Sequence, residues 1–166
     1  MPDRAVTCCF TGHRASKLPW GFDESGLRCA ALKQKIYDAA EAVYESGVRH
    51  FICGMANGCD LYFGEAVLRL RDTLPGITLE AAVPFEGQAD KWDAPLRLRY
   101  DRLLAECDYR TLVSHTYTPD CMTRRNRYMC DCSSVLIAAY DGQKGGTMST
   151  MLYAMRQGLE IIEIMV

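Results

Sequence analysis

This chain of 166 residues lacks the features that mark membrane proteins, secreted proteins and highly basic DNA-binding proteins. It has no cationic start followed by an apolar run, and no stretch of about 18 apolar residues that could span a bilayer. Its net charge is -2 and its pI is about 5.9, so the totals show no basic surface for nucleic acid. These absences predict a cytoplasmic protein with no membrane partner, and they leave the oligomeric state open.

Metal-binding cysteine motifs are also absent, although the chain has nine cysteines. Cys8 and Cys9 lie in an apolar segment, where free cysteine packs as a small hydrophobic side chain. Cys121, Cys130 and Cys132 come nearest to a cluster, yet no pair has the C-x2-C spacing of a zinc site. The odd count and the missing leader favour reduced thiols. We therefore predict neither a disulfide framework nor a metal.

The sequence does contain a regular alternation of apolar strands and amphipathic helices. The pattern predicts strands at 5–11, 48–53, 77–83, 108–114, 134–140 and 159–165, and helices at 27–46, 60–74, 96–107, 122–132 and 147–156. Such alternation implies right-handed crossovers and a mainly parallel sheet that is covered on both faces. The predicted fold class is α/β, a Rossmann-like three-layer sandwich, with one domain over residues 1–166.

The first glycine-bearing loop comes directly after the first strand, where open parallel sheets bind ligands. It contains Thr11, Gly12, His13 and Arg14. Glycine lets the chain turn sharply, and the planar donor fork of arginine suits phosphate or carboxylate. The alternative is a tight turn with a surface arginine and a structural histidine.

The second loop follows the second strand and opens a helix. It runs from Gly54 through Asn57 and Gly58 to Asp60, so backbone N–H groups and the helix dipole can receive an anion. The loop has neither the Gly-Lys-Ser/Thr ending of a P-loop nor a G-x-G-x-x-G fingerprint. For Asp60 the alternative is a simple helix N-cap.

The third loop lies between the fifth strand and the last helix. Gly145, Gly146 and Thr147 provide amides and a hydroxyl for a phosphate or ribose, as does Ser149. The alternative is a glycine-rich connection in the left-handed conformation. Two consecutive glycines before a threonine are more than a turn requires, so we favour ligand binding.

Arginines and aromatic side chains add to these loops. Residues 124–127 place Arg125 and Asn126 near a helix start, where the dipole disfavours cations unless an anion compensates. A solvated basic face is the alternative. Trp92, like Phe85 and Trp20, is a candidate for stacking on a base, although such side chains often only cover the core.

Catalytic motifs are missing. The chain has no G-x-S-x-G elbow, and no His/Cys pair stands out. Glu65, Glu86 and Asp141 are candidate acids by position only, so the catalytic residues stay unassigned.

Taken together, the segments FTGHR, GMANGCDLYFGEA, RRNRYMCD and AAYDGQKGGTMSTMLYA resemble the successive motifs of the YpsA-like branch of the SLOG superfamily. That superfamily includes the LOG phosphoribohydrolases and the Rossmann domain of DprA. The resemblance implies a Rossmann-like domain that senses or processes nucleotide-derived ligands, with the GHR turn, the 54–60 loop and the GGT segment around one pocket. The residues nominated in this way are Gly12, Arg14, Gly54, Gly58, Asp60, Arg125, Asn126, Gly145, Gly146 and Thr147.

One departure from the family bears on catalysis. LOG enzymes carry P-G-G-x-G-T-x-x-E, and aligning Gly146-Thr147 with its G-T puts Thr150 at the glutamate and Gly142 at the proline. N-glycosidic hydrolysis by that route lacks its carboxylate, so whether the chain is an enzyme stays open.

Three functions follow from these observations. The leading expectation is binding or sensing of a nucleotide-derived small molecule: a mononucleotide, NAD, ADP-ribose or a modified nucleotide. The second is hydrolysis of a nucleotide N-glycosidic or phosphate bond, with Glu65, Glu86 or Asp60 as acid or base. The third and least favoured is DprA-like binding of single-stranded DNA through Arg124, Arg125 and Arg127.

Overall fold

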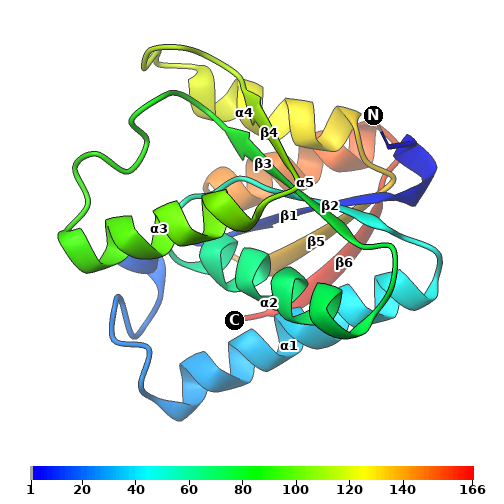
Figure 1. The fold of residues 1–166 in the computed structure, drawn as a ribbon, viewed down its shortest axis with the longest axis horizontal. Coiled ribbons are helices and arrows are strands. Elements are labelled where there is room, and N and C mark those ends of the chain that lie inside the picture. Colours follow the sequence, from blue (N-terminus) through cyan, green and yellow to red (C-terminus); the bar gives the residue numbers. More distant parts are fainter. Residues whose placement is uncertain (1) are drawn as a thin grey trace.

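The computed structural model describes residues 2–166, which contain six strands and five α-helices in alternation (Figure 1). Each predicted element is present, and no end is shifted by more than two residues. No helix within the described residues is long and apolar enough to cross a membrane. The elements are β1 (Thr7–Gly12), α1 (Leu27–Glu45), β2 (His50–Cys53), α2 (Cys59–Thr73), β3 (Thr78–Val83), α3 (Ala94–Glu106), β4 (Tyr109–Leu112), α4 (Cys121–Asp131), β5 (Val135–Tyr140), α5 (Gly146–Arg156) and β6 (Glu160–Met165).

All six strands pair in parallel, in the order β4-β3-β2-β1-β5-β6. The chain builds outward from β1 to β4 and then places β5 and β6 on the other side of β1. The strand order therefore reverses between β1 and β5, and α/β sheets bind ligands beyond the carboxyl ends of the strands at such a point. The predicted Rossmann-like α/β fold is confirmed, with a sheet that is entirely rather than mainly parallel.

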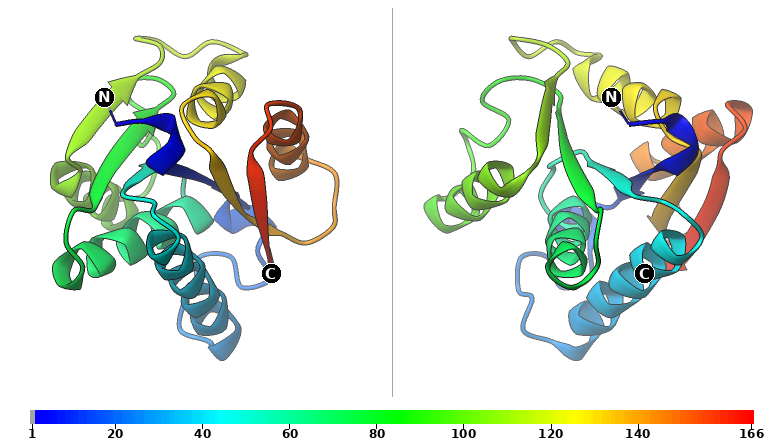
Figure 2. Two further views of the ribbon diagram at one scale, coloured as in Figure 1. Left: turned by 90° about the vertical axis from the view of Figure 1, so that its right-hand side faces the viewer. Right: turned by 45° about the vertical axis from the view of Figure 1, so that its right-hand side comes forward.

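The sheet is covered on both faces, as Figure 2 shows. Helices α1, α2 and α3 pack on one face through a core that includes Phe10 and Phe63, whose rings stack 4.7 Å apart. Helices α4 and α5 pack on the opposite face, around Cys9 and Leu136. The adjacent residues Cys9 and Phe10 therefore pack on opposite sides of the sheet, because successive side chains of a strand point to opposite faces.

A buried acid lies in the sheet beneath α4, and the strand pattern does not predict it. Glu80 of β3 is fully buried, and its Oε1 lies 2.8 Å from Nε2 of His50. The hydroxyls of Thr111 and Tyr128 donate to its other oxygen. Burial raises the pKa of Glu80, but the hydrogen bonds from His50, Tyr128 and Thr111 outweigh it and leave the pKa below the ordinary 4.5.

Candidate functional site

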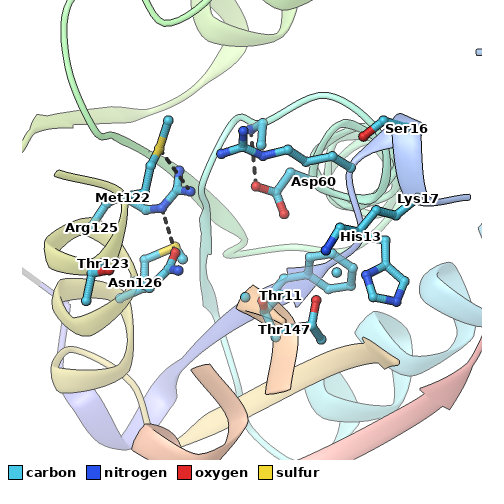
Figure 3. Close-up of a pocket in the computed structure, with 16 residues that line it drawn as sticks. Thr11, His13, Ser16, Lys17, Asp60, Met122, Thr123, Arg125, Asn126 and Thr147 are labelled. Atoms are coloured by element: carbon cyan, nitrogen blue, oxygen red, sulfur yellow. Dashed lines mark hydrogen bonds between the residues drawn. The ribbon is translucent and has the colours of Figure 1, made fainter. Parts of the chain in front are cut away.

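A cavity of about 350 Å³ opens where the loops after β1 and β2 meet the first turns of α4 and α5 (Figure 3). It therefore lies at the reversal of strand order between β1 and β5. Most of the residues predicted to bind a ligand line it. They are Thr11, Gly12, His13, Arg14, Asp60, Arg125, Asn126, Gly146 and Thr147.

Glycines let the loops after β1 and β2 pack directly against each other. A Cβ on Gly12 would lie 2.6 Å from the Cβ of the first residue of α2, and a Cβ on Gly58 would lie 2.6 Å from the backbone nitrogen of Ala15. Two hydrogen bonds join the loops: the first amide of α2 donates to the His13 carbonyl, and the Ala15 amide donates to Oδ1 of Asn57, each at 3.0 Å. Gly58 and Asn57 thus do not line the cavity but hold the two loops that border it together.

Arg125 places a buried guanidinium in the wall of the pocket. Its side chain is only 4% exposed. Its Nη1 donates to the carbonyl oxygen of Gly54, and its Nε donates to Oδ1 of Asn126 at 2.8 Å. A Cβ on Gly54 would lie 2.7 Å from Nη1, so only glycine leaves room for this contact. Burial lowers the pKa of Arg125, and the charge of Asp60 partly opposes that effect.

No carboxylate pairs with this guanidinium. Among residues 2–166, no carboxylate oxygen lies within 4.0 Å of the Arg125 nitrogens. A buried charge without a counter-charge is costly, because desolvation is not offset by Coulomb attraction. The guanidinium in the pocket wall therefore has no carboxylate in direct contact among these residues, and Asp60 acts on it only through space.

Asp60 faces the pocket from the start of α2. It is the second helical residue, and Gly58 is the N-cap, so the simple N-cap interpretation is wrong. Its Oδ2 instead accepts a hydrogen bond from the Ala56 amide at 3.1 Å. Burial raises the pKa of Asp60, although Arg125, the Ala56 amide and Arg14 oppose the shift. The carboxyl group is placed to hydrogen-bond a ligand hydroxyl or amine.

His13 and Asp141 extend from the ends of β1 and β5. The His13 ring is 7% exposed, and its Nε2 lies 2.9 Å from Oδ1 of Asp141. The contact is poorly aligned, so within residues 2–166 this buried nitrogen has no well-directed hydrogen-bond partner. A backbone hydrogen bond from Gln143 and the contact with His13 lower the pKa of Asp141. The buried His13 Nε2 therefore lies beside the Asp141 carboxylate without a well-directed hydrogen bond to it.

The first turn of α5 presents free amides to the cavity. Gly145 is the N-cap and offers no side-chain acceptor, and the first amides of a helix have no intrahelical partner. Gly146 and Thr147 line the pocket from this turn. Lys17, in the 3-10 turn Ala15–Lys17, reaches toward it, because its Nζ would lie 3.3 Å from a Cβ on Gly145. Amide dipoles and a lysine ammonium therefore face the same space.

The structure places some predicted residues elsewhere and adds others. Trp92 does not line the pocket; its ring packs edge-on against Tyr100 of α3, so its position does not support stacking on a ligand there. Several other lining residues were not predicted. Ser16 and Lys17 lie in the segment predicted only as a loop, where a basic residue three positions after Arg14 was an available signal for Lys17. The lining residues that were not predicted are Phe10, Ser16, Lys17, Ala56, Met122, Thr123 and Met129.

The candidate acids Glu65 and Glu86 lie outside the pocket. Glu65 pairs with Arg99 at 2.6 Å, and Glu86 lies on the surface 3.5 Å from His115. Asp60 is the one proposed acid of the hydrolase hypothesis that lines the cavity within the described residues. No group of three His, Cys, Asp or Glu side chains in that part of the chain is arranged to hold a metal ion.

Comparison with known proteins gives a family match over most of the chain. The family model YpsA, which describes the YspA SLOG family, matches residues 8–162. The UPF0398 protein YpsA of Bacillus subtilis is 26% identical over 123 residues, which cover 73% of this chain and 68% of that protein. The uncharacterised SPbeta prophage-derived protein YoqJ of B. subtilis is 31% identical over 136 residues, which cover 74% and 80%.

Two solved structures of DNA processing protein A share the fold. The protein from Streptococcus pneumoniae superposes with a TM-score of 0.62 at 18% identity, over 96% of this chain and 50% of that one. The protein from Helicobacter pylori, described for its single-stranded DNA binding mode, has a TM-score of 0.61 at 16% identity, over 96% and 65%. The chain thus spans about half to two thirds of these longer proteins.

Proposed function

The chain belongs to the YspA SLOG family, as its motifs predicted, and from this premise we propose that it binds a nucleotide or nucleotide-derived small molecule. The phosphate lies against Arg125 and the first turn of α5. The observation that carries this proposal is the buried guanidinium of Arg125, which has no carboxylate within 4.0 Å in the described part of the chain.

An anionic ligand supplies the directly contacting negative charge that Arg125 lacks. Charge-assisted hydrogen bonds to a guanidinium are about twice as strong as neutral ones, and phosphate matches its donor fork. The free amides of Gly146 and Thr147 add the positive end of a helix dipole. Arg14 and Lys17 line the same cavity and add two further cations. These groups come from the loop after β1, from α4 and from the first turn of α5, and they line one cavity.

The rest of the pocket favours a nucleotide over a simple anion. Its volume of about 350 Å³ falls in the range of about 300–1,000 Å³ that organic ligands occupy. Thr11, Asn126 and the buried Asp60 offer hydrogen bonds that a ribose or a base can use. Phosphate and sugar recognition within one cavity is the requirement for a nucleotide.

Single-stranded DNA is the competing ligand. The DNA processing protein A from H. pylori, described for its single-stranded DNA binding, shares this fold. Against it, the net charge of -2 offers little long-range attraction to a polyanion. A DNA ligand requires several phosphate contacts and hence steep salt dependence, whereas a mononucleotide requires few.

The test compares ligand-induced stabilisation in matched variants. AMP, NAD, ADP-ribose and a short oligonucleotide are added to the wild type, to Arg125→Met and to Arg124→Met. Arg124 is exposed on the same helix and lies outside the pocket, so its variant controls for charge loss. A ligand at 100 times its Kd stabilises the wild type by about 2.7 kcal/mol.

We expect the ligand-induced stabilisation to persist in Arg124→Met and to vanish in Arg125→Met. If no nucleotide stabilises the wild type, or if Arg125→Met responds as the wild type does, the proposal is wrong. A response to the oligonucleotide alone, lost steeply with salt, identifies DNA as the ligand instead.

A further inference from the structure

A second cavity of about 290 Å³ continues the first along the seam between α4 and α5. The two cavities share the lining residues Thr123, Asn126 and Gly146, so they adjoin along a groove between the two helices. The second cavity runs along α5 from its first residue to Arg156. At 1.5 Å per residue this is a distance of about 15 Å. Its lining residues are Thr123, Asn126, Arg127, Gly146, Ser149, Thr150, Leu152, Tyr153 and Arg156.

The charge in this second cavity has one sign. Two arginines line it and no acidic side chain does. Within residues 2–166, neither Arg127 nor Arg156 has a carboxylate oxygen within 4.0 Å. Thr150 lies in the floor, 4% exposed, and its hydroxyl donates to the Gly146 carbonyl, so the junction of the two cavities is polar and uncharged.

The aromatic residue of this groove is held in place. The hydroxyl of Tyr153 donates to Oδ1 of Asp131 at 2.7 Å, which fixes the ring across the seam. The guanidinium of Arg127 lies over that ring, 5.3 Å from its centroid. Such stacking orders an arginine side chain on the surface and lowers the entropy lost when it binds an anion.

The arginines of the two cavities are separate, because Arg125 lines only the first cavity and Arg127 and Arg156 line only the second. A phosphate at Arg125 leaves the two arginines of the second cavity without an anion. We propose that the second cavity is a subsite for a second phosphate, so that the ligand carries two phosphate groups on either side of one nucleoside. This inference rests on the proposed function, because it assumes that the first phosphate lies at Arg125. Both a free nucleoside bisphosphate and the 5′ end of a phosphodiester chain have this chemistry.

The test measures the gain in affinity from the second phosphate alone. Dissociation constants are measured by calorimetry for AMP, adenosine 3′,5′-bisphosphate and the 5′-phosphorylated dinucleotide of adenosine. The proteins are the wild type, the double variant Arg127→Gln/Arg156→Gln and the control Arg124→Gln. The control removes a charge from the exposed side of α4, outside both cavities.

We expect the bisphosphate to bind the wild type about 10-fold more tightly than AMP does, the gain of one charge-assisted contact. The double variant loses this difference and keeps the wild-type affinity for AMP, and Arg124→Gln changes neither value. If the dinucleotide matches the bisphosphate, the second phosphate is a diester. If it binds more weakly, the second phosphate is terminal. Either result supports a second phosphate-binding subsite.

Three results would overturn the subsite. The bisphosphate binds no more tightly than AMP, the double variant weakens AMP as much as the bisphosphate, or Arg124→Gln has the same effect as the double variant. In each case AMP still binds the wild type, so nucleotide binding itself stands. If instead neither compound binds the wild type, the proposed function fails as well, so the two failures are distinguishable.

Discussion

Replacing Gly58 by alanine tests whether the loops after β1 and β2, which meet beside the cavity, are packed as tightly as the structure shows. Gly58 is the N-cap of α2, with φ 82° and ψ -130°, a conformation that residues with a Cβ rarely adopt. The added Cβ would lie 2.6 Å from the nitrogen of Ala15, 2.7 Å from the His13 carbonyl oxygen and 2.8 Å from the Arg14 carbonyl carbon. All three are backbone atoms, so no side-chain rotation relieves the overlap.

Two costs add at this position. The strained backbone conformation costs about 1–3 kcal/mol for a residue other than glycine. Overpacking against atoms that cannot rotate away costs about 1–3 kcal/mol more. The expected loss for Gly58→Ala is therefore about 2–6 kcal/mol, a large part of the 5–15 kcal/mol that typically holds a domain folded.

Two other glycines provide controls that separate the costs. Gly158 has the same φ of 82°, but an added Cβ would have no atom within 4 Å, so Gly158→Ala shows the effect of positive φ in open space, about 1–2 kcal/mol. Gly26, with φ -82° and open surroundings, should tolerate alanine within about 0.5 kcal/mol. Equilibrium unfolding in urea gives all three values. If Gly58→Ala costs no more than Gly158→Ala, the tight contact between the loops is refuted.

Other predictions test the charges. Arg125→Met should change the free energy of unfolding of the ligand-free protein by less than about 1 kcal/mol, because relief of the desolvation cost of a buried guanidinium offsets the lost hydrogen bonds to Gly54 and Asn126; a loss of several kcal/mol in urea unfolding would show that Arg125 is structural. Tyr128→Phe should lose about 1.5–3 kcal/mol at pH 7, the value of a hydrogen bond to a charged group. Because the pKa of Glu80 is lowered in the folded protein, its stabilisation is full above pH 4.5 and is lost as the pH falls through the folded pKa. The deficit of Tyr128→Phe should therefore shrink below about pH 4 in urea unfolding at several pH values, and a deficit that is independent of pH would contradict this.

The fold was predictable because each element carries its own periodic signal. Buried parallel strands appear as short apolar runs, such as residues 135–140, and each is separated from the next by a helix with one apolar face. Parallel pairing then brings the carboxyl ends of all strands to one edge. For this reason the loops that begin at Gly12 and Gly54 could be expected to meet from the sequence alone.

Contacts between side chains on different elements were not predictable in the same way. Trp92 was a candidate for stacking on a ligand because its loop is rich in turn residues, but its ring packs edge-on against Tyr100 on the following helix. Glu80 interrupts an apolar strand, and its partners His50 and Tyr128 lie 30 and 48 residues away. Sequence patterns report the period of an element, whereas these contacts depend on the packing angle between elements.

The unpaired guanidinium also predicts how stability and binding are coupled. A buried arginine with no carboxylate in contact lowers the stability of the free protein, and an anion that bound to it would stabilise only the folded state. Arg125 is held over Gly54 by contacts that exist before any ligand arrives, since its Nη1 and Nε already donate to Gly54 and Asn126. The site is therefore preorganised, and the cost of burying the charge is met during folding rather than during binding. Such a site gains affinity because little further ordering is needed when the ligand binds.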